Sequence, residues 1–175
     1  MKRWSGIGWF AMATLIFLGH PSGAFAANNG KCASQVESGA LDFWVGEWNI
    51  GVANENVKAV SRVTRELGDC VVVERWDGGD GHIGENIFGY SADDKSWHGM
   101  FADSVGHVHV FVDGRVVAQS AEFTGPSRGP QGETVLNRIT IRRIGPDHVR
   151  QQWVKSSDGG KTWTTVFDGE YTRKS

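Results

Sequence analysis

The sequence predicts an all-β protein: an antiparallel up-and-down meander barrel of about ten strands, preceded by a short helical turn. From residue 41 onward, apolar and polar residues alternate with the period of two that a half-buried strand requires. Clusters of Gly, Asp and Ser interrupt this alternation about every 8 to 14 residues, as turns between short strands do. Closing such a meander into a barrel leaves no exposed strand edge, whereas a two-sheet sandwich is the alternative arrangement.

The first 26 residues have the pattern of a secretory signal peptide. Lys2 and Arg3 precede an apolar run over 4–18, and the segment ends in Ala-Phe-Ala at 24–26, a small-x-small cleavage motif. The apolar run is shorter than the about 20 residues of a membrane-spanning helix. We therefore expect cleavage after Ala26, no membrane span in the mature chain, and an exported protein that is periplasmic or secreted.

Removing these 26 of the 175 residues leaves 149, which is the size of a single domain. We expect an N-terminal segment with a short helical turn over 27–40 and one barrel domain over 41–175. The formal net charge of -2 becomes -4 when Lys2 and Arg3 are removed, so the charge gives no reason to expect nucleic-acid binding. Composition leaves the oligomeric state open.

Cys32 and Cys70 are the only two cysteines of the chain. In an oxidising compartment such a pair more often forms a bridge than two free thiols, so we expect a disulfide between them. The bridge would close a loop of about 39 residues and contribute about 4 kcal/mol in the chain-entropy model. The alternative of a reactive thiol has no C-x-x-C motif and no neighbouring base to support it.

The first five strands are bounded by clear turn signals. A helical turn near 35–41 precedes the first strand, on which we expect Trp44, Trp48, Ile50 and Val52 to share one face. Gly68-Asp69 and the glycine cluster at 78–81 end the next two strands, and further turns follow the fourth and fifth strands. These signals place strands at about 44–52, 57–67, 70–76, 83–90 and 97–103.

The second half of the chain continues the same rhythm. Asp113-Gly114 is typical of a tight hairpin, so we expect it to join strands at about 107–112 and 115–123. A long loop over 124–133 holds two of the four prolines. Gly-Pro-Asp at 145–147 and the cluster at 157–160 are the remaining turns. The last three strands are then expected at about 134–144, 148–155 and 162–172.

Gly46-Glu47-Trp48 on the first strand resembles the G-x-W signature of lipocalin and calycin barrels. In those barrels the Trp plugs the floor, and an Arg from near the last strand covers its ring in a cation-π contact. The resemblance implies the same structural roles for Gly46, Trp48 and Arg173.

A wider set of segments is similar to a family of exported bacterial proteins of unknown function, which are thought to adopt a calycin-type barrel. The resemblance covers nearly all of the mature chain and implies the fold, but the family has no shared activity that could be transferred. The segments that carry it are Leu41-Asp42-Phe43-Trp44-Val45-Gly46-Glu47-Trp48, Glu74-Arg75-Trp76 with Cys70, and the stretches 97–103, 149–153, 157–163 and 167–171.

Residues 156–163, Ser-Ser-Asp-Gly-Gly-Lys-Thr-Trp, match the Asp-box motif of sialidase propellers. Its physical basis is a hairpin: Asp158 accepts hydrogen bonds from turn amides, Gly160 takes a conformation closed to residues with a Cβ, and Trp163 packs across the turn. Sialidases carry several copies and this chain has one, so we predict a structural role for the motif.

Several polar residues lie on strand faces that are otherwise apolar. Glu74 shares a face with Trp76, and Gln151 shares one with Trp153. If these faces point inward, the lumen is aromatic with a few polar groups, which is typical of a small-molecule pocket. The predicted ligand-binding residues are Glu74, Trp76, Trp97, Phe101, Gln151 and Trp153.

We therefore predict an exported barrel that binds a small, partly hydrophobic ligand, whose identity the sequence leaves open. One alternative is an enzyme of the cyclase, isomerase or lyase type, in which Glu74, Asp103 or His98 acts as acid or base. Another is a structural or partner-binding module, which would carry an exposed apolar patch outside the barrel.

His107 and His109 are two residues apart, so they project to the same side of a strand and are candidate metal ligands. A zinc site needs at least one further ligand, and His82, His98 or Asp103 could supply it. A haem-binding barrel of the nitrobindin kind would need one axial His in the lumen.

The valines between and after these histidines favour a simpler arrangement. If Val108, Val110 and Val112 face the core, both histidines face water. We therefore predict neither a metal site nor a cofactor.

Overall fold

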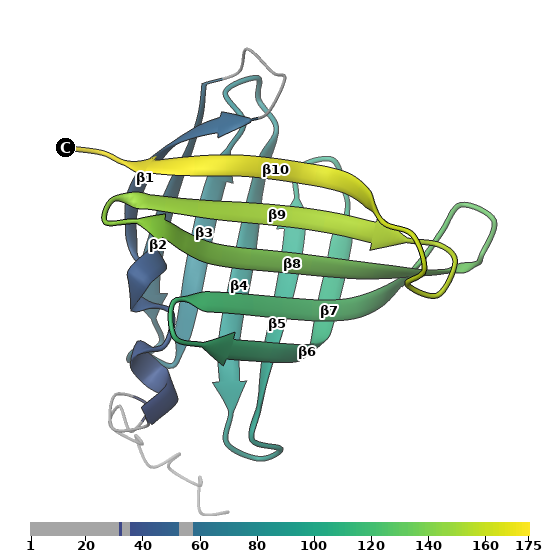
Figure 1. Cartoon of the computed structure of the whole chain (residues 1–175), viewed down its shortest axis with the longest axis horizontal. Helices are drawn as coiled ribbons and strands as arrows, with labels where there is room; N and C mark the ends of the chain where they lie inside the picture. The colour runs from purple at the N-terminus through teal and green to yellow at the C-terminus, as the bar shows by residue number, and fades with distance from the viewer. Residues whose placement is uncertain (1–31, 33–35, 53–57) are drawn as a thin grey trace, which may run out of the picture.

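The computed structural model describes residues 32, 36–52 and 58–175. Its ten strands form one closed antiparallel barrel in which each strand pairs with its sequence neighbours and β1 closes on β10 (Figure 1). This confirms the up-and-down barrel and excludes the sandwich. The predicted signal peptide lies outside the described residues. The elements are η2 (Val36–Gly39), η3 (Asp42–Trp44), β1 (Gly46–Val52), β2 (Ala59–Glu66), β3 (Val71–Asp77), β4 (Ile83–Ser91), β5 (Ser96–Asp103), β6 (Val108–Val117), β7 (Ser120–Arg128), β8 (Thr134–Gly145), β9 (His148–Ser156) and β10 (Thr164–Arg173).

The predicted hairpin at Asp113-Gly114 is wrong, because these residues lie inside β6 and the chain turns instead at 118–119. The backbone of Gly114 lies close against the two neighbouring strands. A Cβ at this position would lie 2.6 Å from Trp97 Cβ and 2.7 Å from the Phe123 ring. The glycine therefore permits close strand packing rather than a turn. The long loop is also shorter than predicted, since β7 continues to Arg128.

One end of the barrel is closed by aromatic side chains, and we call this end the floor. Trp48 is fully buried, and its indole N–H donates to the carbonyl of Trp44 at 2.9 Å. The Arg173 guanidinium lies 4.2 Å above the Trp48 ring and donates to the carbonyl of Val45 at 3.1 Å. Gly46 has φ +148°, and a Cβ there would overlap that guanidinium. These residues occupy the places that the G-x-W resemblance implied.

The remaining floor is a continuous apolar core. Phe88 and Phe123 stack with ring centroids 4.1 Å apart, and Trp97 meets Phe123 edge to face at 6.5 Å. Phe111 and Ile141 are fully buried beside them in the same cluster. This end of the barrel is filled by side chains, as the interiors of small barrels usually are.

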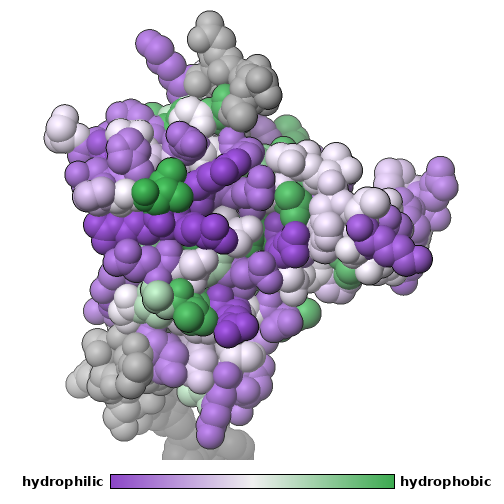
Figure 2. Space-filling view, in the orientation of Figure 1, coloured by the Kyte–Doolittle hydropathy of each residue, from purple (hydrophilic) through white to green (hydrophobic). Residues whose placement is uncertain are grey.

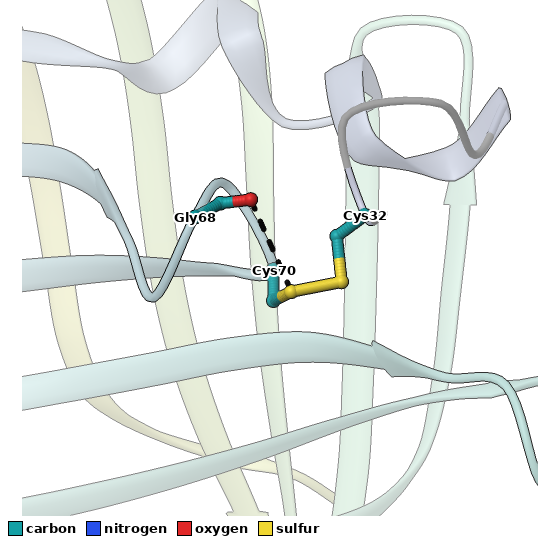
Figure 3. The surroundings of a disulfide bond; sticks show 3 residues. All are labelled: Cys32, Gly68 and Cys70. Atoms are coloured by element: carbon teal, nitrogen blue, oxygen red, sulfur yellow. Dashed lines mark hydrogen bonds between the residues drawn. A yellow bond between two sulfur atoms is a disulfide. The ribbon is translucent and has the colours of Figure 1, made fainter. Parts of the chain in front are cut away.

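A disulfide joins Cys32 to Cys70, as the sequence predicts (Figure 3). Cys70 lies in the turn between β2 and β3, where its Sγ is near the carbonyl oxygen of Gly68. The bridge therefore fixes the first described residue to the closed end of the barrel.

The outer wall is mostly polar on the face that β8, β9 and β10 form. On this face hydrophilic side chains dominate, and hydrophobic ones occur as separate spots (Figure 2). Within the part of the chain that the structure describes, no helix has the length and apolar character needed to cross a membrane.

Candidate functional site

The other end of the barrel opens into a cavity of about 800 Å³. All ten strands contribute to its lining, and residues from the turns at 78–82, 104–107, 129–133 and 157–163 surround its mouth. Ligand pockets usually measure about 300–1,000 Å³, so the cavity has room for a small molecule.

One group of aromatic rings in the cavity lining joins β9 to β5 and β6. The Trp153 ring meets Phe101 edge to face with centroids 5.2 Å apart, and it meets His109 at 4.7 Å. The Trp153 indole N–H donates to Asn137 Oδ1 at 3.2 Å, and this hydrogen bond fixes the orientation of the ring. The three rings therefore present a preformed apolar wall.

A second aromatic group is centred on Trp76 of β3. Its ring meets Phe167 of β10 edge to face at 6.2 Å and His82 at 5.2 Å. Since β1 and β2 lie between β3 and β10 in the barrel, the contact between Trp76 and Phe167 passes in front of those two strands. The cavity thus has aromatic rings on two sides.

A buried polar network forms the inner end of the cavity, around Glu74. The Glu74 side chain is 0% exposed, and its carboxyl group accepts hydrogen bonds from Ser61 Oγ, Tyr171 Oη and Asn86 Nδ2, each at 2.8 Å. Tyr171 Oη also contacts Gln151 Oε1. Burial raises the pKa of Glu74 above its ordinary value, although these hydrogen bonds oppose the shift. Burial, together with the nearby Glu74 charge, also raises the pKa of Tyr171.

Some buried polar atoms have no hydrogen-bond partner in the protein. Among the described residues there are four such side-chain atoms: Asn86 Oδ1, Trp76 Nε1, His109 Nδ1 and Trp44 Nε1. The first three belong to residues that line the cavity, whereas Trp44 lies in the floor. Nearly all buried polar groups in proteins are paired, and an unpaired one costs about 1–3 kcal/mol. Unpaired polar atoms therefore concentrate around the lumen.

Asp103 organises the mouth of the cavity. Its side chain is 2% exposed, and Oδ2 accepts hydrogen bonds from His107 Nδ1 at 2.8 Å and His82 Nε2 at 3.1 Å. Oδ1 accepts the backbone N–H groups of Val105 and His107 at 3.1 and 2.8 Å. Burial acts to raise the pKa of Asp103, but the hydrogen bonds outweigh it and hold that pKa well below its usual range. Asp103 therefore ties together two of the mouth turns.

The hairpin at 156–163 forms the rim beside β9 and β10. Asp158 Oδ1 accepts two backbone N–H groups of the turn at 2.9 Å, and Oδ2 accepts Thr162 Oγ1 at 2.6 Å. Gly160 has φ +88°, and its carbonyl accepts the Trp163 indole N–H at 3.0 Å. The Arg138 guanidinium covers the Trp163 ring at 4.2 Å. The motif thus makes the internal contacts of a hairpin at the rim of the cavity.

Five of the six predicted ligand-binding residues line the cavity, namely Glu74, Trp76, Phe101, Gln151 and Trp153. Trp97 does not, because it lies nearer the floor on the same strand face as Phe101 and packs against Tyr90 at 5.7 Å. His98, a candidate acid or base, also lies away from the cavity. Its Nε2 is 2.8 Å from Asp94 Oδ2 in the turn between β4 and β5.

The predicted orientation of β6 is wrong. Val108, Val110 and Val112 are 62%, 51% and 55% exposed, whereas His109 lines the cavity and Phe111 is fully buried. The alternation was correct, but the opposite face of the strand points inward. The valines lie on the outer surface, where Val110 pairs with the exposed Met100 of β5. An apolar strip, the feature expected of a partner-binding module, is therefore present as well as a cavity.

The candidate metal ligands do not come together as a metal site. Within the described ranges, no group of three or more His, Cys, Asp or Glu side chains could hold a metal ion. His107 and His82 hydrogen bond with Asp103, and His109 packs against Trp153. For the haem alternative, His109 lines the cavity, and its Nδ1 is buried with no hydrogen-bond partner in the described part of the chain. The histidines thus belong to the packing and hydrogen bonding of the mouth.

Sequence reasoning missed several residues of the polar network. Asn86 lies on the inward face of β4 next to Phe88, and an amide among apolar residues was the available signal. Tyr171 and Ser61 contact Glu74 from strands that are distant in sequence, so no local pattern identifies them. Asn137 orients Trp153 in the same non-local way.

The comparisons with known proteins identify no family. No protein-family model matches the chain, and no curated protein matches it significantly. The function is therefore argued from the geometry of the lumen.

Proposed function

We propose that this protein binds a small, partly hydrophobic molecule inside its barrel. The observation that supports this most is the cavity of about 800 Å³, which opens at the end opposite to the floor. The floor demonstrates that this chain can fill a barrel with side chains. The open half of the barrel lacks packing contacts that would stabilise a filled core. A cavity that lowers stability in this way favours a functional explanation.

The distribution of polar groups supports an amphipathic ligand. The aromatic rings of Trp76, Phe101 and Trp153 line the walls, and the amides and carboxyl group around Glu74 form the inner end. An apolar body would pack against the rings, while a polar group would lie toward the network.

The acid–base enzyme alternative has weaker support. Glu74 and Asp103 line the same cavity, and the usual strand dimensions place their Cα atoms roughly 12 Å apart, within reach of one substrate. However, Asp103 already accepts four hydrogen bonds that hold the mouth turns. Its surroundings therefore favour a structural role over proton transfer.

Two sequence motifs extend the proposal to the family of the protein and to its cellular location. The Arg173 guanidinium over Trp48 supports kinship with calycin-type barrels. The signal-peptide pattern of the first 26 residues supports export, with the ligand met outside the cytoplasm.

Titration with the neutral aromatic dye N-phenyl-1-naphthylamine tests lumenal binding. We expect saturable binding at one site, with quenching of tryptophan fluorescence. The Trp153→Leu variant should bind the dye at least about tenfold more weakly, which corresponds to about 1.4 kcal/mol. The matched control is Trp163→Leu, because Trp163 lies on the rim hairpin under Arg138 and not in the cavity lining. Absence of saturable binding, or equal loss in both variants, would contradict the proposal.

A further inference from the structure

The carboxyl group at the inner end of the cavity has no cationic partner in the described chain. The three hydrogen-bond donors of Glu74 are a hydroxyl, a phenol and an amide, all neutral. Nearby cations are engaged elsewhere: Arg75 faces outward and pairs with Glu66, and Arg65 pairs with Asp42 at the closed end. The negative charge of an ionised Glu74 is therefore uncompensated by the protein.

The cations that line the cavity lie at its mouth. Lys155 is exposed near the rim hairpin, and Arg128 donates from Nη1 to the carbonyl of Gly132 in the mouth turn. The inner end thus combines one acidic group with amides and aromatic rings. An anionic ligand group would meet a carboxylate there and no positive charge.

One buried acceptor at the inner end has no partner among the described residues of the protein. Asn86 uses its Nδ2 group to bind Glu74 Oε2, while its own Oδ1 has no partner and the residue is only 3% exposed. A carboxylate oxygen and an amide oxygen therefore lie close together. An ammonium group offers three N–H donors and no acceptor, so it complements this pair.

The walls of the cavity also favour a positive charge. The faces of Trp and Phe rings attract cations, by about 0.5–2 kcal/mol for each contact. In a site sheltered from water, the attraction between an ammonium and a buried carboxylate is stronger than in bulk solvent. An apolar amine would use both features at once.

From this arrangement we propose that the lumen selects organic cations: small amines whose apolar body packs against Trp76, Phe101 and Trp153 and whose ammonium group lies toward Glu74 and Asn86. The proposal rests on lumenal binding as proposed above and adds the charge of the ligand. Glu74 acts in it as the counter-charge.

Three ligands with the same phenylpropyl body test the charge preference: 3-phenylpropylamine, 3-phenylpropan-1-ol and 3-phenylpropionate. Their affinities for the folded protein would be measured at pH 7 by calorimetry and tryptophan fluorescence. We expect the amine to bind at least about tenfold more tightly than the alcohol, and the carboxylate to bind most weakly. Glu74→Gln should reduce amine affinity to about the level of the alcohol, and it should change amine affinity by a larger factor than alcohol affinity.

A second variant separates the effect of the Glu74 charge from the effect of disturbing its hydrogen-bond network. Tyr171→Phe removes one hydrogen bond to Glu74 but keeps the carboxyl group, so the preference for the amine should persist. Equal affinity for amine and alcohol would overturn cation selection and leave lumenal binding intact. An equal loss of both ligands in Glu74→Gln would also overturn it, because Glu74 would then only maintain the cavity. If none of the three ligands nor the neutral dye binds, lumenal binding itself is wrong.

Discussion

The floor and the lumen of this barrel use similar side chains in opposite ways. In the floor, Trp48 and Phe88 are fully buried and each ring packs against further rings. In the lumen, Trp76 and Trp153 are only partly buried and border open space. The difference teaches that aromatic side chains close one half of the barrel and leave the other half open: the floor packs the closed sheet, and the lumen keeps the space that the proposed ligand binding requires.

The two ends also differ in how they treat charge. At the floor, the Arg173 guanidinium has a ring beneath it, the Val45 carbonyl beside it and Asp147 Oδ1 at 3.3 Å. At the inner end of the lumen, Glu74 has neutral donors alone among the described residues. Of these two charged groups, only Arg173 has an oppositely charged partner, and Arg173 belongs to the stabilising half.

The largest expected effect is on stability, from truncating the floor tryptophan. Trp48→Ala should lower the free energy of unfolding by about 3–5 kcal/mol, near the upper limit, because the fully buried ring leaves a cavity in a packed core. Trp153→Ala should cost less than about 2 kcal/mol, since its ring already borders open space. Urea denaturation measures both values. Equal costs would show that the lumen is as important for stability as the floor.

The next effect concerns Glu74 and pH. Its pKa in the folded state is raised above the ordinary 4.5, so the native state binds this proton more tightly than the unfolded chain. Stability should therefore fall as pH rises through the interval between the two pKa values, by about 1.4 kcal/mol for each unit of difference. Asp103 and Asp158, whose pKa values are lowered, act oppositely and only at more acidic pH.

Denaturation of Glu74→Gln between pH 5 and 8 tests this effect, because the variant should lose the decline. Tyr171→Phe should keep it and extend it to higher pH, since the Tyr171 hydrogen bond lowers the Glu74 pKa. A decline that survives in Glu74→Gln would place its origin in another group.

The smallest effect compares two arginines that cover tryptophans at the same distance. Arg173 covers Trp48 in the floor and Arg138 covers Trp163 on the rim hairpin, both at 4.2 Å. Arg173→Met should cost about 1–2 kcal/mol, because it also loses the hydrogen bond to Val45. Arg138→Met should cost about 0.5–1 kcal/mol, because the Trp163 ring that it covers is only partly buried, whereas Trp48 is fully buried. Thermal unfolding of both variants would contradict the division of tasks if the rim substitution cost more.

The fold was predictable because turns and alternation are local signals. The hairpin at Asp113-Gly114 was misplaced because a glycine needed for close strand packing has the same sequence signal as a turn glycine. The inward face of β6 was misassigned because its valines suggested the core, whereas His109 and Phe111 point inward. Which face of a strand points inward depends on its register with the neighbouring strands, and the residue pattern of one strand carries no information about that register.

The candidate site was predictable where a polar residue shares a face with an aromatic one, as Glu74 does with Trp76. Trp97 satisfies the same rule but lies at the floor, because alternation specifies the side of a strand and not the depth along the barrel. The hydrogen bond between Tyr171 and Glu74 joins residues 97 positions apart, so it emerges only when the sheet closes.

The position of the C-terminus has a practical consequence. Cys32 is bonded to Cys70 at the closed end, and near the C-terminus the N–H of Lys174 donates to the carbonyl of Glu47 at 2.8 Å, also at that end (Figure 1). The mouth therefore points away from any surface or fusion partner attached through the C-terminus. Immobilised in this way, the barrel would present its cavity to solution, which suits it to use as a tethered sensor or capture reagent.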